Sequence, residues 1–472
     1  MTTPRDQSVD SRSTQPVDQD VPGRGPAPKH ALQQRHIVMI ALGGVLGSGL
    51  FVGSGAGLRL AGPGIILSYT VAGILFLLVM RMLGEMAAAY PTGGSFSVHA
   101  TRAHGRSVGT TLGWMYWLLL VVAIAVEAGI AATLLHGWLS WLPQWAGVLV
   151  LMTVFTAVNL AAVGVFGELE FWFAALKVAV VLAFIGLGAL SMCGVLPGSP
   201  ATVTAHLTGH GGFLPNGLAG VAAGLLAVMF SFGGSEAVTI AAAETADPVR
   251  AIRSAVRTVV WRLLGFYLGS ILVMILLLPC DSVPAGHSPY VAVLDVIGFP
   301  GAAFFMEAVV FVAVLSALNA NLYSASRMIR SLAERGEAPG ALTRTTRQGV
   351  PALAVVASAS FGFIAVALNF LWPTTVFTVL LNSVGAVMLL VWFAVAATHL
   401  RLRRHLEKHE PERLVLRTPG FPYLTWVALL VIGVLFVLML TTSEARLQLL
   451  GTALTTGIVL CVVTVTGKGR TS

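Results

Sequence analysis

Three ionisable side chains, Glu127, Lys177 and Glu236, lie inside long apolar runs, where a charge is costly and usually kept for a function. Lys177, in "FWFAALKVAVVLAF", is about eight residues into its run, or roughly 12 Å along a helix. Its ammonium would therefore reach a membrane surface only with difficulty. Burial disfavours the charged form, so we predict that Lys177 is a proton-coupling group. The alternative is a snorkelling lysine with no role.

The two glutamates each allow two interpretations. Glu127, in "VVAIAVEAGIAA", could meet a substrate ammonium or carry a proton, or it could be a carboxyl satisfied by a neighbouring helix. Glu236 follows a pair of glycines. It could gate a cytoplasmic path or relay protons, or it could make a structural hydrogen bond to backbone that the glycines free.

Glycines interrupt two of the apolar runs. The stretch "GGVLGSGLFVGSGAG" (43–57) has seven glycines in fifteen residues, and each costs a helix about 1 kcal/mol relative to alanine. Unwinding at Gly47, Ser48 and Gly49 would turn bare backbone toward a polar cavity, as broken helices do in transporters. The alternative is close helix packing through GxxxG pairs. A second interruption, made by Gly233 and Gly234 within Phe230–Gly234, favours unwinding.

Polar residues also form a stripe in the run 301–335. Ser316, Asn319 and Tyr323 are spaced i, i+3 and i+7, which places them on one helical face. A polar face cannot lie against lipid, so we expect it to border the cavity.

The elements that must position these residues are membrane helices. Of the 472 residues, 56% are hydrophobic and 10% charged, against about 25% charged in soluble domains. Apolar blocks of this length predict an all-α polytopic membrane protein. We expect twelve transmembrane helices, at 36–62, 63–87, 108–138, 144–166, 169–193, 217–243, 258–280, 301–335, 351–371, 374–400, 421–442 and 446–467.

The basic residues predict the orientation, because lysine and arginine collect in cytoplasmic loops. With the N-terminus inside, nearly all of them fall on one side, whereas the outer loop 194–216 has no charged residue. The net charge of +8 then lies beside anionic lipid and needs no nucleic acid as a partner. We expect both termini in the cytoplasm, and a disordered cytoplasmic tail at 1–34.

The two glycine interruptions are five spans apart, which predicts a five-plus-five inverted repeat with discontinuous helices 1 and 6. The first repeat would be 35–193, the second 217–400, and spans 11 and 12 at 421–467 would be additions. The three cysteines, Cys193, Cys280 and Cys461, have no metal-site spacing, and we expect no metal or cofactor. The sequence does not reveal whether the protein is a monomer or a homodimer.

Several motifs together resemble the bacterial amino-acid transporters of the amino acid–polyamine–organocation superfamily. They are "GSGLFVGSG", "RMLGEMAAAYPTGGSFS", "GELEFWFAALKV", "FSFGGSEAVTIAAAETADP" and "LNANLYSASRM". The likeness runs from about residue 35 to 404. "EAVTIAAAE" and "SLAERGEAP" are most similar to the gamma-aminobutyrate permeases of this superfamily.

The resemblance implies a proton-coupled permease with the inverted-repeat fold. It implies that backbone N–H groups at Gly47, Ser48 and Gly49 bind a substrate carboxylate. Carbonyls at positions matching Phe230, Ser231 and Gly233 would bind the ammonium. Lys177 matches a lysine that stands where sodium sits in sodium-driven relatives, and Glu236 matches a glutamate after the sixth-helix break.

We therefore expect a permease of the cytoplasmic membrane that imports a small amino acid, such as gamma-aminobutyrate, together with a proton by alternating access. Other substrates stay open: asparagine, proline, or a basic or aromatic amino acid. The rival classes are a channel or a non-transporting amino-acid sensor. An enzyme ranks last, because the spans show no nucleophile–base or metal constellation. Sodium coupling is the second mechanism, although the ammonium of Lys177 would repel the ion.

Overall fold

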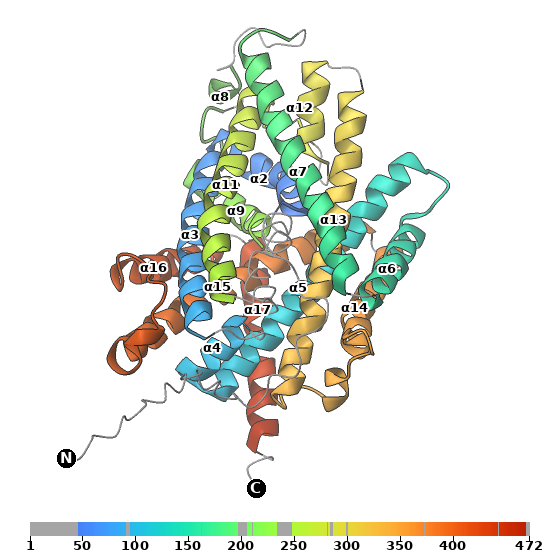
Figure 1. Ribbon diagram of the computed structural model, residues 1–472. Helices are drawn as coiled ribbons and strands as arrows, with labels where there is room; N and C mark the ends of the chain where they lie inside the picture. The colour runs from blue at the N-terminus through green and yellow to red at the C-terminus, as the bar shows by residue number, and fades with distance from the viewer. Residues whose placement is uncertain are drawn as a thin grey trace, which may run out of the picture.

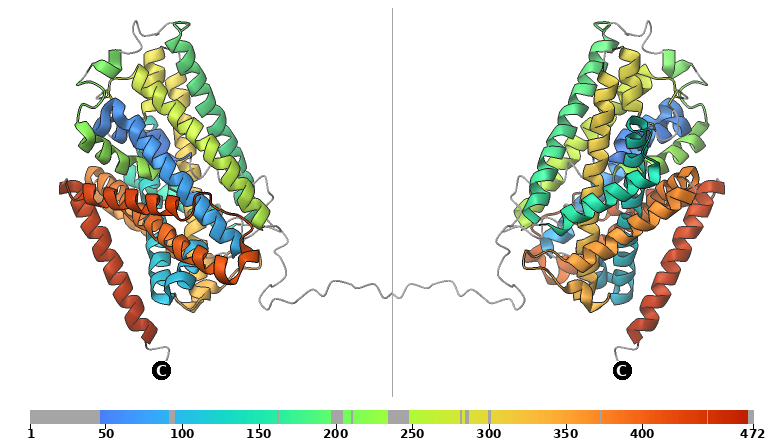
Figure 2. Two further views of the ribbon diagram at one scale, coloured as in Figure 1. Left: turned by 90° about the vertical axis from the view of Figure 1, so that its left-hand side faces the viewer. Right: turned by 90° about the vertical axis from the view of Figure 1, so that its right-hand side faces the viewer.

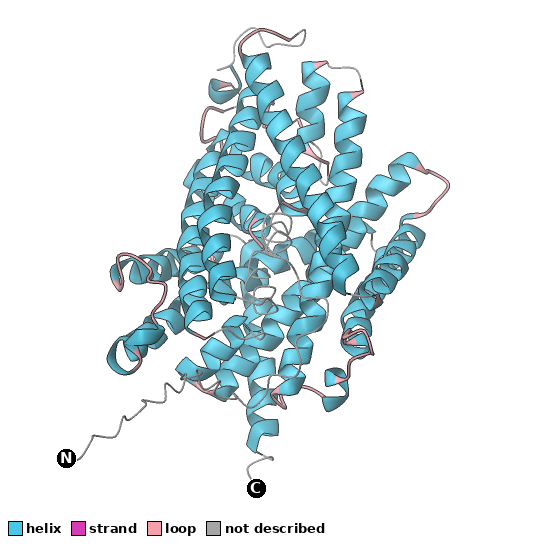
Figure 3. Ribbon diagram, in the orientation of Figure 1, coloured by secondary structure: helices cyan, strands magenta, loops and turns pink. Residues whose placement is uncertain are grey.

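The computed structural model describes residues 46–90, 95–161, 163–196, 205–209, 211–233, 248–280, 282–283, 287–298, 301–371, 373–441 and 443–468. Within these ranges every regular element is a helix and none is a strand, as Figure 3 shows. The predicted all-helical class is therefore confirmed. The expected tail at 1–34 lies outside the described residues.

The main helices follow the expected apolar runs in order (Figure 1). They are η1 (Gly49–Gly53), α2 (Ser54–Ala61), α3 (Ile65–Ala89), α5 (Arg106–Trp138), α6 (Gln144–Leu160), α7 (Val163–Met192), α9 (Gly217–Ser231), α11 (Pro248–Leu277), α13 (Ala302–Glu334), α14 (Ala352–Leu371), α15 (Pro373–His409), α16 (Tyr423–Met439) and α17 (Ser443–Lys468). Six helical stretches in the described ranges are long and apolar enough to cross a membrane.

The packing places the early and middle helices together at the centre. Helix α5 packs against α13, and α2 packs against α9, although each pair is far apart in the chain. Helix α3 runs beside α11 (Figure 1). Helix α17 instead leans along one side of the molecule, as Figure 2 shows, and its side chains are largely exposed. An apolar helix that is left uncovered by protein is suited to face lipid.

The first described helix starts irregularly. Leu46 and Gly47 form a bend, and η1 then has π-helical hydrogen bonding before the chain continues as α2. Helix α2 ends at Gly62, whose φ of 60° is readily adopted only by glycine. A Cβ atom on Gly62 would also lie 2.4 Å from Cγ of Pro215. Both the backbone conformation and this clash therefore exclude a side chain at position 62.

Two segments expected to be loops contain helices. Helix α4 (Ser95–His104) lies between the second and third expected spans, and α12 (Pro289–Ile297) lies between the seventh and eighth. Helix α4 is buried on one face through Phe96, Ala100 and Ala103, which pack toward α5. His99 is buried on α4 as well, and burial together with the charge of Arg102 lowers its pKa to about 3.

A buried ion pair ties the end of α3 to the last third of the chain. Arg403 of α15 donates a hydrogen bond of 2.5 Å to Oε1 of Glu85. The other carboxylate oxygen, Oε2, accepts the backbone N–H of Thr418 and lies 3.4 Å from Nε2 of His399. Glu85 and Arg403 are both almost fully buried. Glu85 therefore holds α3, α15 and the segment before α16 together.

We expect Glu85→Ala to destabilise the protein by about 3–5 kcal/mol, because it leaves the guanidinium of Arg403 buried without its main partner. Thermal unfolding of purified protein in detergent measures the effect. Glu334→Ala is the matched control: it breaks the exposed Arg330–Glu334 pair, which should contribute less than about 1 kcal/mol. Equal melting temperatures for the two variants would contradict the structural role of Glu85.

Candidate functional site

The start of η1 and the end of α9 meet in the interior. The hydroxyl of Ser231 donates a hydrogen bond of 2.6 Å to the carbonyl oxygen of Gly49. The phenol oxygen of Tyr69, on α3, lies 3.1 Å from the same hydroxyl, and the phenol of Tyr267, on α11, donates to the carbonyl of Ser231. Phe232 packs edge-on against Tyr267. A hydrogen-bonded cluster thus joins the two segments whose glycines stood out in the sequence.

Helix α9 ends where the sequence places an interruption. Ser231 is its last residue, and Phe232 and Gly233 follow as a turn in which the N–H of Phe232 bonds the carbonyl of Met229 at 3.1 Å. Phe230 lies in the last turn of α9. Glu236, the third ionisable residue singled out in the sequence, lies outside the described residues.

Lys177 is at the centre of a buried polar cluster. Its ammonium donates a hydrogen bond of 2.8 Å to the hydroxyl of Ser316 on α13, which in turn donates one of 2.7 Å to Oε1 of Glu170 on α7. The ammonium nitrogen lies 3.7 Å from the same oxygen, and both charged side chains are 0% exposed. The snorkelling alternative is therefore wrong, because the ammonium of Lys177 ends inside the protein.

Glu127 lies close to the same cluster. It accepts a hydrogen bond of 3.0 Å from the side-chain amide of Asn321 on α13 and a longer one, 3.4 Å, from the hydroxyl of Ser48. The carboxylate and the ammonium of Lys177 are near enough for their charges to interact. A neighbouring helix therefore satisfies the carboxyl group of Glu127, as one interpretation expected, and its role in meeting a substrate ammonium or carrying a proton stays a prediction.

The acidic groups of this cluster outnumber its basic groups. Two carboxyl groups, on Glu127 and Glu170, accompany one amine, on Lys177, and all three side chains are buried. Fully ionised, they would leave one unbalanced negative charge in a low-dielectric interior, which is costly. Uptake of one proton neutralises the cluster. The arrangement can therefore exchange a proton when its contact with water or with a ligand changes.

Comparison with known proteins identifies the family of this chain. The family described as Amino acid permease matches residues 36–470. The chain belongs to this family. The permease is 45% identical to the gamma-aminobutyric acid permease of Bacillus subtilis, over 94% of this chain and 95% of that protein. It is 42% identical to the aromatic amino acid transport protein AroP of Corynebacterium glutamicum, over 93% and 96%.

Solved structures agree on the fold. The permease matches the crystal structure of a mutant manganese transporter from Eremococcus coleocola with a TM-score of 0.57. The match covers 92% of this chain and 94% of that one at 14% sequence identity, so it concerns the fold alone. The expected family is thus confirmed. The protein is an integral membrane transporter and not an enzyme.

Sequence reasoning missed three polar residues of the permease that complete the site. Glu170 lies seven residues before Lys177 on the same helical face, a spacing that could have revealed it. Asn321 binds Glu127, and Asn159 of α6 donates a hydrogen bond of 2.8 Å to the side-chain oxygen of Asn319. Two of the three residues of the polar stripe on α13, Ser316 and Asn319, thus face polar partners on neighbouring helices.

Proposed function

We propose that this permease imports a small zwitterionic amino acid, with gamma-aminobutyrate as the first candidate, in symport with a proton by alternating access. The observation that carries the proposal is the contact between Ser231 and Gly49, beside which lies the buried Lys177 cluster. Relatives support the substrate: permeases for gamma-aminobutyric acid from Bacillus subtilis and Escherichia coli are 45% and 40% identical to this chain.

The substrate site proposed here uses backbone dipoles. Helix η1 begins at Gly49, and its N-cap residue Ser48 makes no side-chain cap hydrogen bond, so the N–H groups near Gly47, Ser48 and Gly49 suit a carboxylate. Helix α9 ends in the opposite sense, and carbonyls at its C-terminal end, around Phe230, Ser231 and Gly233, suit an ammonium. The two ends of a zwitterion would thus be met without burying an unpaired charge.

Proton coupling is assigned to the Lys177 cluster. When the site opens to the acidic side, a proton would neutralise the excess carboxylate shared by Glu127 and Glu170. Ser48 links this event to substrate, because its hydroxyl contacts Glu127 while its backbone belongs to the proposed carboxylate site. Glu236 keeps its proposed role in gating or relay on the cytoplasmic side.

We further propose twelve spans in a five-plus-five inverted repeat, with the cytoplasmic membrane as the location and both termini inside. In support, the main helices follow the expected runs in order, and η1 and α9 are in the runs expected for spans 1 and 6. The proposed repeats keep the boundaries 35–193 and 217–400, with the C-terminal pair at 421–467. Basic residues support the orientation, because α4 and the end of α15 carry arginines on the side assigned to the cytoplasm.

Transport by purified protein in liposomes tests this function. We expect labelled gamma-aminobutyrate to accumulate when the lumen is alkaline relative to the outside, and a sodium gradient at equal pH to give no accumulation. A competition panel of the twenty amino acids ranks other substrates, including the aromatic ones suggested by the relative AroP. Exchange of labelled for unlabelled substrate excludes a sensor. Accumulation driven by sodium alone would overturn proton coupling.

A further inference from the structure

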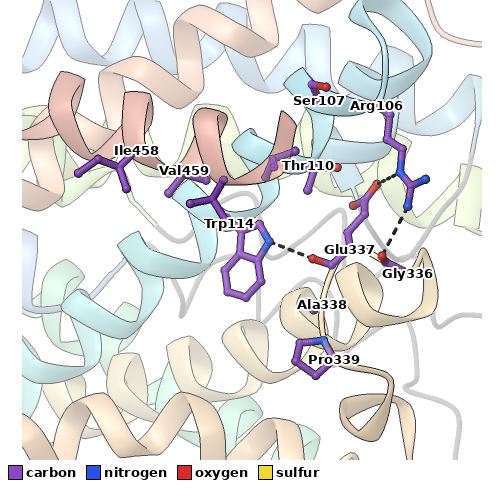
Figure 4. Close-up of a pocket in the computed structure, with 12 residues that line it drawn as sticks. Arg106, Ser107, Thr110, Trp114, Gly336, Glu337, Ala338, Pro339, Ile458 and Val459 are labelled. Atoms are coloured by element: carbon purple, nitrogen blue, oxygen red, sulfur yellow. Dashed lines mark hydrogen bonds and ion pairs between the residues drawn. The ribbon is translucent and has the colours of Figure 1, made fainter. Parts of the chain in front are cut away.

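A cavity of about 560 Å³ lies between the core and the outer helix α17, and none of the residues of the site above lines it. Its walls come from the first turns of α5, the segment Gly336–Pro339 that follows α13, and residues 458–463 of α17. Figure 4 shows Arg106, Trp114 and Glu337 on one side, with Ile458 and Val459 of α17 opposite. This groove contains part of the motif "SLAERGEAP", to which the transport site gives no role.

The polar wall of the groove carries one cation, Arg106, and one anion, Glu337, and a second cation, Arg335, pairs with Glu337 from behind the wall. The guanidinium of Arg106 donates a hydrogen bond of 3.2 Å to the carbonyl of Arg335 and lies 3.9 Å from the carboxylate of Glu337. Glu337 is held more closely by Arg335, at 2.8 Å. Two guanidinium groups therefore face one carboxylate. Arg106 is also half exposed and stands in the first turn of α5, where Gly105 supplies no side-chain cap and the helix dipole favours an anion.

A buried hydroxyl without a partner lines the same groove. Thr110, one turn after Arg106, is 3% exposed, and its Oγ1 makes no hydrogen bond to any of the described residues. A buried polar atom that stays unpaired costs roughly 1–3 kcal/mol, so such atoms usually have a partner. An oxygen of a ligand lying in the groove would supply that partner.

The opposite wall of the groove is apolar. Ile458, Val459 and Val462 present side chains of α17, the helix that leans away from the bundle (Figure 2). Trp114 turns its indole N–H to the carbonyl of Glu337, at 3.2 Å, and its ring borders the groove. Tryptophan with one wet and one apolar side is typical of the level of lipid headgroups.

We propose that this groove binds an anionic phospholipid of the cytoplasmic leaflet. Its phosphate lies at Arg106, with Ser107 and Thr110 as hydroxyl partners, and one acyl chain runs along α17. The charge excess selects an anionic over a zwitterionic headgroup, and the apolar wall selects a lipid over a soluble phosphate. Only the leaflet rests on the orientation proposed above; the chemistry of the site does not depend on the transported substrate.

Binding to the purified, full-length permease tests the lipid site without any transport measurement. After delipidation in mild detergent, native mass spectrometry counts bound phosphatidylglycerol or phosphatidylcholine, and thermal unfolding reports the stabilisation that ligand binding to the folded state produces. Arg106→Gln removes the charge, Thr110→Val removes the unpaired hydroxyl at similar volume, and Val459→Trp fills the apolar side. Arg330→Gln is the matched control, because Arg330 is a partly exposed arginine of α13 outside the groove.

We expect phosphatidylglycerol to bind more tightly than phosphatidylcholine. Arg106→Gln should lower the affinity for phosphatidylglycerol about tenfold, because the variant loses a charge-assisted contact with the phosphate. Thr110→Val should leave the lipid-free melting temperature unchanged or raise it, while reducing the rise caused by phosphatidylglycerol. Val459→Trp should weaken both lipids with every charged group intact. Equal binding of the two lipids, unchanged binding by Arg106→Gln and Val459→Trp, or equal stabilisation by inorganic phosphate would each overturn the proposal.

Discussion

Uptake driven by a pH gradient is expected to fall to background in Lys177→Ala, the largest effect of any single substitution considered. The ammonium of Lys177 is the one positive charge we find beside the carboxyl groups of Glu127 and Glu170 within the described residues, and both carboxyl groups interact with it electrostatically. Without it the two buried carboxyl groups have no cation to balance a negative charge, so releasing a proton from the cluster becomes costly. Accumulation in proteoliposomes with an alkaline lumen measures the loss.

Two further variants separate coupling from folding in that experiment. The double variant Lys177→Met with Glu170→Gln removes the amine and its nearest carboxylate together and leaves one buried carboxyl group, that of Glu127, which is uncharged when it keeps a proton. We expect it to melt near the wild type, to bind substrate, and still not to accumulate it. Lys408→Ala, at an exposed lysine near the end of α15, is the matched control and should transport normally. Full accumulation by the double variant would exclude Lys177 from coupling.

Substrate binding is expected to fall at least about a hundredfold in Gly49→Leu. Gly49 is fully buried at the first position of η1, and its carbonyl accepts the hydroxyl of Ser231 at 2.6 Å. A leucine side chain there would occupy the space at the start of η1 and cover the N–H groups proposed to bind a carboxylate. Equilibrium binding of labelled gamma-aminobutyrate to purified protein measures the change.

The control for this substitution is the same change at a glycine with free space. A Cβ atom on Gly186, an exposed position of α7, would meet nothing within 4 Å, so Gly186→Leu should bind and transport as the wild type does. If Gly49→Leu folds, as shown by an unchanged melting temperature, and binds substrate normally, the glycines of the first span serve helix packing and the proposed site is wrong.

Much of the architecture could be predicted because lipid imposes a local rule. A backbone that crosses a bilayer must satisfy its own hydrogen bonds, so each crossing is a long apolar helix and is visible as a run in the sequence. The same rule made Lys177 and Glu127 stand out in the sequence, because a charged side chain inside an apolar run is energetically costly and is usually kept for a function. The end of α9 at Ser231 also falls at a position that its neighbouring glycines predict.

The helices of the polar connections could not be predicted in this way. Helix α4 was expected to be a basic loop, and its burial depends on contact with α5 and α15. The pairing of Glu85 with Arg403 joins residues more than three hundred positions apart, so no local sequence pattern predicts it. Such contacts are decided by which helix ends meet after the bundle has assembled.

The sequence by itself determined the membrane class, the family and the order of the apolar helices, because these follow from local hydrophobicity and local motifs. It also identified the ionisable residues and the glycines that lie inside the apolar runs. Only the tertiary structure decided that Lys177 faces Ser316 and Glu170, that Ser48 touches Glu127, and that Arg106 and Thr110 line a groove under α17. Those neighbours come from different helices, and a helix's rotation about its axis is set by packing against the others.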